Sequence, residues 1–529
     1  MKTKSLLFGL LASAAMVSCT NEVDSIENIG ANQKGEQSYL AVNLSAITRT
    51  TPTFEAGSAV ENEVSKVAFF FFDAAGNAYD VTGNGKNRLD KDYTPDPNEE
   101  FTGDVNVEES STPILVIEKS KQVPPQKIVA VLNCPISEDN ISLSDLQGKV
   151  GAYNTITVDG KTYFVMSNSV YKNEATGEEM VATDIPALSI SHSSAAALAN
   201  PVTIYVERVA AKVAVTASYA TGETSFSTGI STSKGKAINA IVEGWEVVNA
   251  KTQARLLKDI DPTWSFAWNW NAAGNYRSYW ATNTTDENII RELSWDMEKP
   301  AYRYYYENTD VEKFDDATTT QLEGNQSYLL VKASFVDEDG TVLSGENAVA
   351  EWYGAKYTFA DLKAQFANAV ATQIYVKTGD KTAKSIEPKH ITFYQEDENE
   401  AAKRYLCYAT LDSKTTKDLV FVSGVDEDGE FITMTVGEVN NILAGIRPAK
   451  IWEAGGYYYL PIAHNATVNG LVRNHVYQMD ITGVTGLGTP VYDPEKIIRP
   501  EKPVQDESFI SADIKVLSWK VVINDVVLQ

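Results

Sequence analysis

Histidine and cysteine are both scarce in this sequence. The 529 residues include four histidines and three cysteines, and no two cysteines have the C-x-x-C spacing of a zinc or redox site. None of the histidines lies in an H-E-x-x-H motif or near a cysteine; they are His192, His390, His464 and His475. We therefore expect no metal site, no cofactor and no catalytic triad, and we interpret the histidines as structural.

Three cysteines cannot form a disulfide framework, so stability must come from side-chain packing. Cys134 and Cys407 lie in apolar strand contexts in different halves of the chain. We interpret both as buried free thiols, although an exported protein could pair them.

Basic residues are too few for a protein that binds nucleic acid. There are 45 Lys and Arg against 71 Asp and Glu, a net charge of -26. This charge would repel a phosphate backbone, so we expect no nucleic-acid partner. Hydrophobic residues make up 43% of the chain and aromatic residues 10%, which is enough to form real cores. At about 150 residues per domain, the length predicts two to four domains.

The N-terminal residues have the pattern of an export signal. Lys2 and Lys4 precede an apolar run over residues 6–17, which is too short to span a bilayer but matches the apolar region of a signal peptide. The run ends beside Cys19, and the sequence Met-Val-Ser-Cys there resembles the lipobox of bacterial lipoproteins. Acyl chains on Cys19, palmitate among them, would hold the chain on a membrane. The alternative is a secretory signal with an incidental cysteine.

A strand and a loop follow a polar tether. Leu40, Val42 and Leu44 alternate with other residues, which predicts a half-buried strand. The Thr-rich stretch at residues 47–52 ends in a proline and contains Arg49. We expect an exposed loop there, in which an Arg-specific protease could cut. An ordinary surface arginine is the alternative.

The body of the chain is predicted to be mostly β. Short β-branched or aromatic runs recur between turn residues, most clearly at residues 67–72, 128–132, 163–166 and 202–206. Helical periodicity is sparse, and the helix candidates, each near a Ser, Thr or Asp that could cap it, are residues 142–153, 359–371 and 436–443. A Ser/Thr/Gly-rich stretch over residues 216–236 marks the predicted boundary between two halves.

The C-terminal end has a spacer followed by two strands. Residues 493–503 contain three prolines, which favour an extended, stiff segment. An apolar-rich strand is predicted at residues 519–528, and before it four aliphatic residues alternate with polar ones: Ile510, Ala512, Ile514 and Val516. A strand with one apolar face needs a partner. The partner is either the second domain of the same chain or the sheet of a neighbouring subunit, which would gain a strand.

The order of several segments carries a resemblance to a known family. The segments of the first half are residues 39–42 (YLAV), 66–69 (KVAF), 127–133 (KIVAVLN) and 206–213 (VERVAAKV). Those of the second half are residues 325–332 (NQSYLLVK), 456–459 (GYYY), 472–477 (VRNHVY) and 514–519 (IKVLSW). With the lipobox and Arg49, they resemble the type V pilins, the fimbrilins of Gram-negative bacteria, and among these the shaft subunit of minor-type fimbriae. The resemblance covers residues 38–529.

The resemblance implies an all-β fold of two transthyretin-like β-sandwich domains, with a few short helices and a C-terminal donor-strand tail. It divides the chain into a signal peptide (1–18), a propeptide with a tether and a removable strand (19–49), an N-terminal domain (50–220), a C-terminal domain (221–492) and the tail (493–529). Cys19 would carry the lipid, and the bond between Arg49 and Thr50 would be cut. The groove left by the first strand would then accept the tail of a neighbouring subunit.

The expected function is therefore that of a structural, non-enzymatic pilus subunit that mediates adhesion. Its expected partners are identical subunits in a cell-surface filament, together with anchor and tip pilins. The precursor is expected on the outer membrane, attached through its lipid. Because the chain has both Arg49 and a tail, the resemblance favours a shaft subunit. A secreted hydrolase would need a nucleophile, a base and an orienting group, which the sequence does not place together.

Two further patterns have a functional and a structural interpretation. The sequence Val-Asp-Glu-Asp-Gly occurs at residues 336–340 and 425–429, and acidic turns can bind calcium. The first-ligand position of an EF-hand would fall on Phe335 or Gly424, so we expect Asp-Gly hairpin turns instead. The aromatic cluster at residues 264–280 is interpreted as core packing. As a sugar-stacking surface it would favour the alternative function, a glycan-binding outer-membrane lipoprotein.

Overall fold

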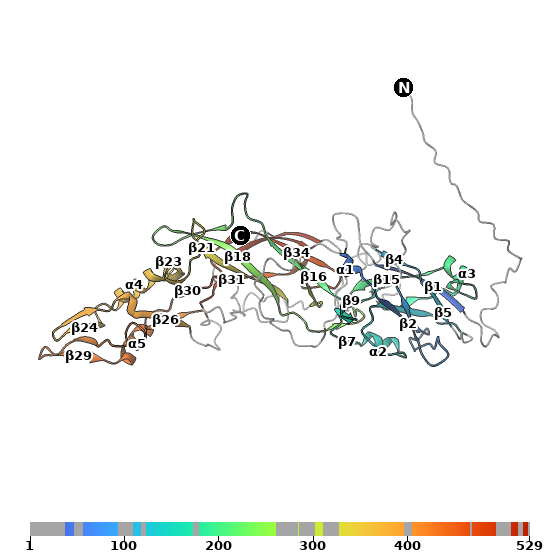
Figure 1. The fold of residues 1–529 in the computed structure, drawn as a ribbon, viewed down its shortest axis with the longest axis horizontal. Helices are drawn as coiled ribbons and strands as arrows, with labels where there is room; N and C mark the ends of the chain where they lie inside the picture. The colour runs from blue at the N-terminus through green and yellow to red at the C-terminus, as the bar shows by residue number, and fades with distance from the viewer. Residues whose placement is uncertain are drawn as a thin grey trace, which may run out of the picture.

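The structure is a computed structural model that describes residues 38–46, 57–93, 109–117, 123–172, 179–260, 284, 302–309, 327–395, 405–465, 468–492, 509–516 and 522–526. Over these residues the fold is mostly β, as expected. The α-helices are short: α1 (Ala59–Asn62), α2 (Leu143–Gln147), α3 (Ser194–Ala199), α4 (Phe359–Ala369) and α5 (Val436–Ala444). No helix within these ranges is long and apolar enough to cross a membrane. The molecule is elongated: the described chain starts at one end, passes through the middle to the other end, and returns to the middle (Figure 1).

The N-terminal elements form a large sheet with the path β14-β1-β15-β10-β6-β2-β3, to which β4, β5 and β13 are added. Its strands are β1 (Ser38–Ala46), β2 (Lys66–Phe72), β3 (Arg88–Asp92), β4 (Glu109–Ser111), β5 (Ile114–Ile117), β6 (Lys127–Leu132), β10 (Met166–Asn168), β13 (Thr183–Asp184), β14 (Ile190–Ser191) and β15 (Val202–Arg208). Central strand β2 is apolar at almost every position because both its faces are buried. Val67 and Phe69 pack in a core on one face, whereas Ala68 and Phe70 pack in a second core on the other.

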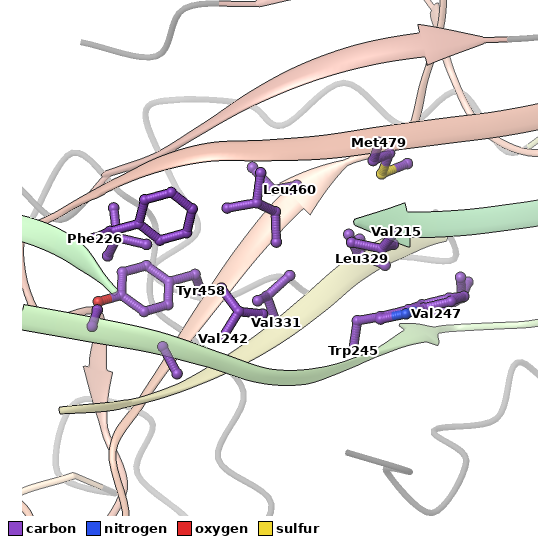
Figure 2. Close-up of a cluster of buried hydrophobic side chains, with 14 of the residues drawn as sticks. Val215, Phe226, Val242, Trp245, Val247, Leu329, Val331, Tyr458, Leu460 and Met479 are labelled. Carbon is purple, nitrogen blue, oxygen red and sulfur yellow. The ribbon is translucent and has the colours of Figure 1, made fainter. Parts of the chain in front are cut away.

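The second half contains a β-sandwich made of two five-stranded sheets. One sheet has the order β20-β16-β34-β36-β37, formed by β20 (Arg303–Tyr305), β16 (Ala211–Ala217), β34 (Val476–Thr485), β36 (Phe509–Val516) and β37 (Val522–Val526). The other has the order β17-β18-β21-β31-β35, formed by β17 (Phe226–Ser231), β18 (Ala237–Val248), β21 (Tyr328–Val336), β31 (Gly456–Pro461) and β35 (Thr489–Pro490). Figure 2 shows their shared core, in which Val215 and Met479 of the first sheet face Val331 and Leu460 of the second.

Residues between β21 and β31 build a further core at the far end of the molecule (Figure 1). Its strands are β22 (Val349–Trp352), β23 (Ala355–Thr358), β24 (Tyr375–Gly379), β25 (Thr382–Ser385), β26 (Ile391–Gln395), β27 (Cys407–Leu411), β28 (Phe421–Val425), β29 (Phe431–Met434) and β30 (Lys450–Trp452). Helices α4 and α5 pack into it, and the side chains of Thr358 and Thr435 cap their first turns. This core was not expected from the sequence, which assigned the whole range 221–492 to one sandwich.

Short strand pairs complete the fold: β7 (Val150–Gly151) with β19 (Ala254–Arg255), β8 (Thr155–Val158) with β9 (Lys161–Phe164), β11 (Tyr171–Lys172) with β12 (Glu179–Met180), and β32 (Ala463–Asn465) with β33 (Val468–Asn469). The helices expected at residues 359–371 and 436–443 are confirmed. The helix expected at residues 142–153 is too long, because it ends at Gly148 and the chain turns into β7, which pairs with β19 more than 100 residues further along the chain. The domain boundaries remain a prediction; the strand at 211–217, before the predicted boundary at 220, pairs in the second half's sheet.

Candidate functional site

The strand predicted around Leu40 lies in the middle of the N-terminal sheet. It is β1, and it is hydrogen-bonded along both edges. One edge pairs antiparallel with β5 and then with β4, and the other pairs antiparallel with β14 and then parallel with β15. Among the described strands, β4, β5 and β14 have no strand partner except β1. A single nine-residue strand therefore holds these three strands to the rest of the sheet.

The side chains of β1 that the structure describes are completely buried. Leu40, Ala41 and Val42 each have 0% of their surface exposed. Leu40 and Val42 belong to the core of one sheet face, and the residues of that core on the flanking strands are Leu115, Ile117, Ile190, Val202, Ile204 and Val206. We call these six residues the groove. Burial of one aliphatic side chain contributes about 1.5–3 kcal/mol, so an empty groove would be costly in water.

The chain after β1 is anchored at α1, close to the predicted cleavage site. The buried carboxylate of Glu61 forms an ion pair with Lys212 at 2.9 Å and accepts a hydrogen bond of 2.6 Å from the hydroxyl of Tyr304. It also accepts one from the backbone N–H of Ser58, the helix cap. Burial alone would raise the pKa of Glu61, but these hydrogen bonds and the charge of Lys212 hold it below its ordinary value of 4.5. The chain that follows β1 is thus fixed to β16 and β20, which belong to one sheet of the β-sandwich.

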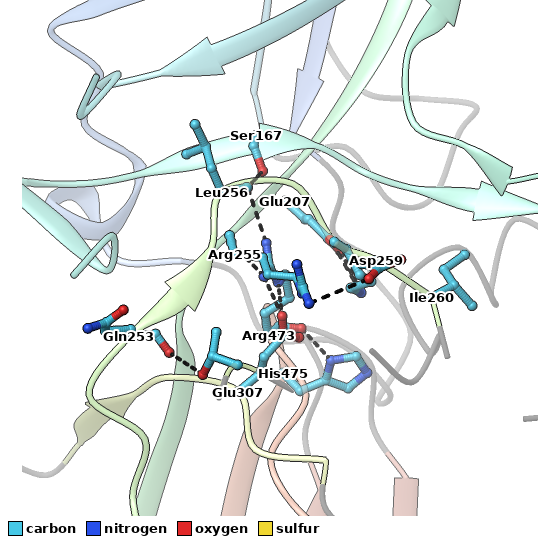
Figure 3. A network of polar contacts seen from close by, with 12 residues as sticks. Ser167, Glu207, Gln253, Arg255, Leu256, Asp259, Ile260, Glu307, Arg473 and His475 are labelled. Carbon is cyan, nitrogen blue, oxygen red and sulfur yellow. Dashed lines mark hydrogen bonds and ion pairs between the residues drawn. The ribbon is translucent and has the colours of Figure 1, made fainter. Parts of the chain in front are cut away.

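A buried ion pair within the second half holds the segment that contacts the N-terminal sheet (Figure 3). Arg473, in the turn before β34, is 0% exposed, and its Nε donates a hydrogen bond of 2.8 Å to Glu307. Its guanidinium also donates to the backbone carbonyl oxygens of Arg255 and Leu256. Burial would raise the pKa of Glu307, but the charge of Arg473 lowers it below its usual range. Arg473 therefore fixes the segment that carries Leu256.

That segment lies against the N-terminal sheet and is held there by a second ion pair. Lys258 contacts Glu207 at 3.2 Å, and both side chains are 0% exposed. Leu256 packs in the core on that face, and its carbonyl oxygen accepts a hydrogen bond of 2.6 Å from Ser167. Burial raises the pKa of Glu207 above its ordinary value. Glu207 and Arg208 end β15, and Arg208 donates a hydrogen bond of 3.0 Å to the backbone of Glu61. The end of β15, a strand that forms one wall of the groove, is therefore held by these buried contacts.

The C-terminal aliphatic residues lie in β36, paired antiparallel with β34 of the same chain. Ile514 is opposite Met479, Ala512 opposite Ile481 and Ile510 opposite Val484. Because the β34 residues of these pairs are buried in the sandwich core, the register places the aliphatic positions of β36 on the core side of the sheet. In this structure the tail is docked on its own subunit, which is one of the two arrangements expected from the sequence.

The structure brings together some of the predicted site residues and not others. Leu40 and Val42 lie in the groove, whereas Val516 ends β36, which pairs with β34 in the β-sandwich. Cys19, Arg49, Thr50 and the aromatic residues 264–280 lie outside the described residues. The roles assigned to all of these residues remain predictions.

Sequence reasoning missed the buried charges. Glu207 and Arg473 both lie in segments that carried the family resemblance, 206–213 and 472–477. A charged residue inside an otherwise apolar stretch is a signal for a buried ion pair. The sequence could not name the partner, since Arg473 and Glu307 are 166 residues apart.

The acidic turns are hairpin turns, as expected. The Asp337 carboxylate accepts hydrogen bonds from the backbone N–H groups of Asp339 and Thr341, and Asp426 binds its own turn in the same way. Gly340 and Gly429 have φ angles of +76° and +79°, which side chains disfavour. In the part of the chain that the structure describes, no three His, Cys, Asp or Glu side chains are grouped so as to hold a metal ion.

The two described cysteines are free thiols. Cys407 is fully buried, and burial raises its thiol pKa. Cys134 is only half-buried rather than buried, because it lies just beyond the end of β6, and burial raises its pKa to about 11. Three of the histidines are buried, namely His390, His464 and His475, whereas His192 is exposed.

Comparison with known proteins gives one sequence match. Residues 452–525 match the family model described as major fimbrial subunit protein type IV, Fimbrillin, C-terminal. The search of curated proteins finds no match.

Solved structures similar to the chain include two proteins of Porphyromonas gingivalis. One is the tip fimbrial protein Mfa3 with a C-terminal truncation, at 10% identity and a TM-score of 0.32, covering 91% of this chain and 100% of that one. The other is a fimbrilin, fimA, at 14% identity and a TM-score of 0.32, covering 91% of this chain and 98% of that one. The residues matched by the family model include β34 and β36, so over this C-terminal part the chain is similar to fimbrillins and the resemblance inferred from the order of its segments is confirmed.

Proposed function

We propose that this chain is a structural subunit of a cell-surface fimbrium that polymerises by strand exchange and mediates adhesion. The observation that carries the proposal is the position of β1. It is the shared partner of four strands and fills the groove with Leu40 and Val42. If β1 left, the backbone groups of these strands would lose their hydrogen bonds and apolar side chains would meet water. Such a groove needs another strand.

Cleavage after Arg49 would turn β1 into a separate peptide. Residues 47–56 connect β1 to the anchored helix α1, so a cut between Arg49 and Thr50 would leave α1 on the body and β1 on the released side. A covalently attached strand rebinds at a high effective concentration, and a cut strand does not. Cleavage would therefore make dissociation of β1 more favourable, although the contacts of β1 in the sheet stay the same.

The groove is expected to persist when β1 is exchanged. Strand β15 forms one wall of the groove along Val42–Ala46. It ends in Glu207 and Arg208, which are held in place by the ion pair with Lys258 and by the hydrogen bond to the backbone of Glu61. The donor would be the tail of a second copy, in which Ile510, Ala512, Ile514 and Val516 repeat the two-residue spacing of Leu40, Val42 and Leu44. We propose that a lipid on Cys19 attaches the precursor to the outer membrane, and that anchor and tip pilins join the same filament.

The first test is the intact mass and N-terminal residue of protein taken from the cell surface. A chain that begins at Thr50 supports cleavage, whereas a lipidated Cys19 start contradicts it and favours a retained lipoprotein. Arg49→Ala should yield a longer, unpolymerised precursor because the groove stays filled. Arg447→Ala, which removes an exposed arginine elsewhere, is the matched control and should be processed normally. Normal fibres from Arg49→Ala would overturn gating by cleavage.

The donor is tested by a chain that lacks residues 505–529. Far-UV circular dichroism first establishes that the truncated chain is folded. It should remain a monomer and give no detergent-resistant ladder on gels run without heating. Ladders from this variant would contradict the donor assignment.

A further inference from the structure

The docked tail places three aspartates directly opposite one another. In the register of β34 and β36, Asp480 is paired with Asp513, and in the register of β36 and β37, Asp513 is paired with Asp525. We call these three residues the aspartate row. In an antiparallel pair, residues directly opposite have Cβ atoms about 4.5–5.5 Å apart, and like charges at such positions are destabilising.

The row lies on the outer face of the sheet. Side chains alternate between faces along a strand, and the neighbours of Asp480 on β34, Met479 and Ile481, point into the sandwich core. On the next strand, Thr216 is opposite Asp480 and is exposed. Its hydroxyl donates a hydrogen bond of 2.9 Å to the Asp480 carboxylate, and the hydroxyl of Ser218 donates another of 2.7 Å. These bonds hold one negative charge of the row in a fixed place.

One basic residue lies next to the row in the register of the strands. The basic residue at the adjacent register positions of the described strands is Lys515, two residues along β36 from Asp513 and opposite Gln478 and Ile523. Diagonal positions of this kind are about 7–8 Å apart, compared with about 5 Å for direct pairs. In the register of the strands, the positions of like charge are therefore nearer to one another than the position of opposite charge.

The groove of a second copy would present neutral neighbours instead. In β1 the outward positions are paired with Thr203 and Tyr205 of β15 and with Ile114 and Val116 of β5. None of these four side chains carries a charge. A tail that took the place and direction of β1 would thus separate Asp513 from Asp480 and place it among neutral residues.

We propose that repulsion within the aspartate row weakens the docking of the tail on its own subunit, which favours transfer of the tail into the groove of a second copy. This inference rests on the proposed function for the transfer step. The weakening of the docked tail is a property of the single chain, so it is measurable in the uncleaved precursor before any assembly.

The test uses Asp480, which stays on β34 and is not part of the tail. Asp480→Asn removes one like-charge pair and keeps an acceptor for the hydroxyls of Thr216 and Ser218. In the uncleaved precursor, amide hydrogen exchange over residues 509–516 should slow by about two- to five-fold, and more in Asp480→Lys, where the pair becomes attractive. Asp428→Asn removes one charge from an exposed turn far from the tail and should leave the exchange unchanged. Unchanged or faster exchange in both Asp480 variants would overturn the proposal, because a purely structural Asp480 predicts loosening when its hydrogen bonds are lost.

The second readout is the rate of polymerisation after cleavage. Asp480→Asn should polymerise more slowly than wild type by a similar factor, and Asp428→Asn at the wild-type rate. If amide hydrogen exchange slows in Asp480→Asn but the polymerisation rate is unchanged, the role of the row in tail transfer is refuted. A wild type that is cleaved but never polymerises would refute the proposed function and the transfer step together, while the exchange data would still decide whether the row weakens the docked tail.

Discussion

Leu40→Ala in the uncleaved chain should destabilise the N-terminal sheet by about 2–5 kcal/mol. Leu40 is 0% exposed and packs in the same core as Leu115 and Ile190. The substitution removes the transfer free energy of the lost methyl and methylene groups and leaves a cavity between strands. The cost should fall in the upper part of this range, because β1 is hydrogen-bonded on both edges and cannot collapse into the space.

The effect should be local as well as global. Strands β5 and β14 have β1 as their strand partner in the described part of the chain, so a weaker β1 should expose their backbone amides to exchange. Hydrogen exchange at residues 114–117 and 190–191 should therefore accelerate, while β18 and β21 of the β-sandwich keep their protection. Urea unfolding of the same protein gives the loss of stability itself.

Leu188→Ala is the matched control, since it makes the same chemical change at a side chain that is 58% exposed. Its effect on stability should stay within about 0.5 kcal/mol. Equal effects of the two substitutions, or an unchanged exchange rate at residues 114–117 in Leu40→Ala, would refute the view that β1 holds the sheet together.

Three further predictions concern positions outside the groove. Arg473→Met should cost about 3–5 kcal/mol in urea unfolding because it leaves a buried carboxylate without its cation, whereas Lys86→Met, at an exposed ion pair, should cost about 0–1 kcal/mol. The pKa of Glu61 lies below its ordinary value of 4.5, so its carboxylate stabilises the fold above pH 4.5, and this stabilisation is lost as the pH falls through the folded-state pKa. The stability difference between wild type and Glu61→Gln should therefore shrink as the pH falls below 4.5, and a constant difference would contradict this. Gly456→Ala should cost about 1–3 kcal/mol in thermal unfolding, since a Cβ there would lie 2.1 Å from a backbone carbonyl oxygen, while Gly424→Ala, which meets nothing within 4 Å, should be tolerated.

Local patterns predicted the individual elements well. The apolar run at 67–72 is β2, the capped segments after Thr358 and Thr435 are helices, and the two Asp-Gly sequences are turns. Each depends on residues that are neighbours in the chain: side-chain alternation, a capping hydroxyl, or a glycine with positive φ. The helix expected at 142–153 failed for the opposite reason, since β7 forms by pairing with β19, a segment more than 100 residues away in the chain.

The candidate site was predictable only in part. The alternation of Leu40, Val42 and Leu44 identified a strand with one apolar face, but not that the strand is central or that it runs parallel to β15. The residues that line the groove come from three other strands, and their own patterns are those of any half-buried strand. The further core between β21 and β31 was missed because the sequence patterns of its strands and helices do not differ from those of the sandwich. Only the packing shows that these elements pack against one another and form a core of their own.

The sequence by itself determined which side chains share a face, because alternation and periodicity are properties of a single segment. It placed Ile510, Ala512, Ile514 and Val516 on one side of a strand and Asp513 on the other. Only the tertiary structure decided which segments meet: β1 with β15, Arg473 with Glu307, and Asp480 with Asp513. The physical reason is that pairing and register depend on how all strands bury their apolar faces together, so the sequence of one segment does not determine its partner.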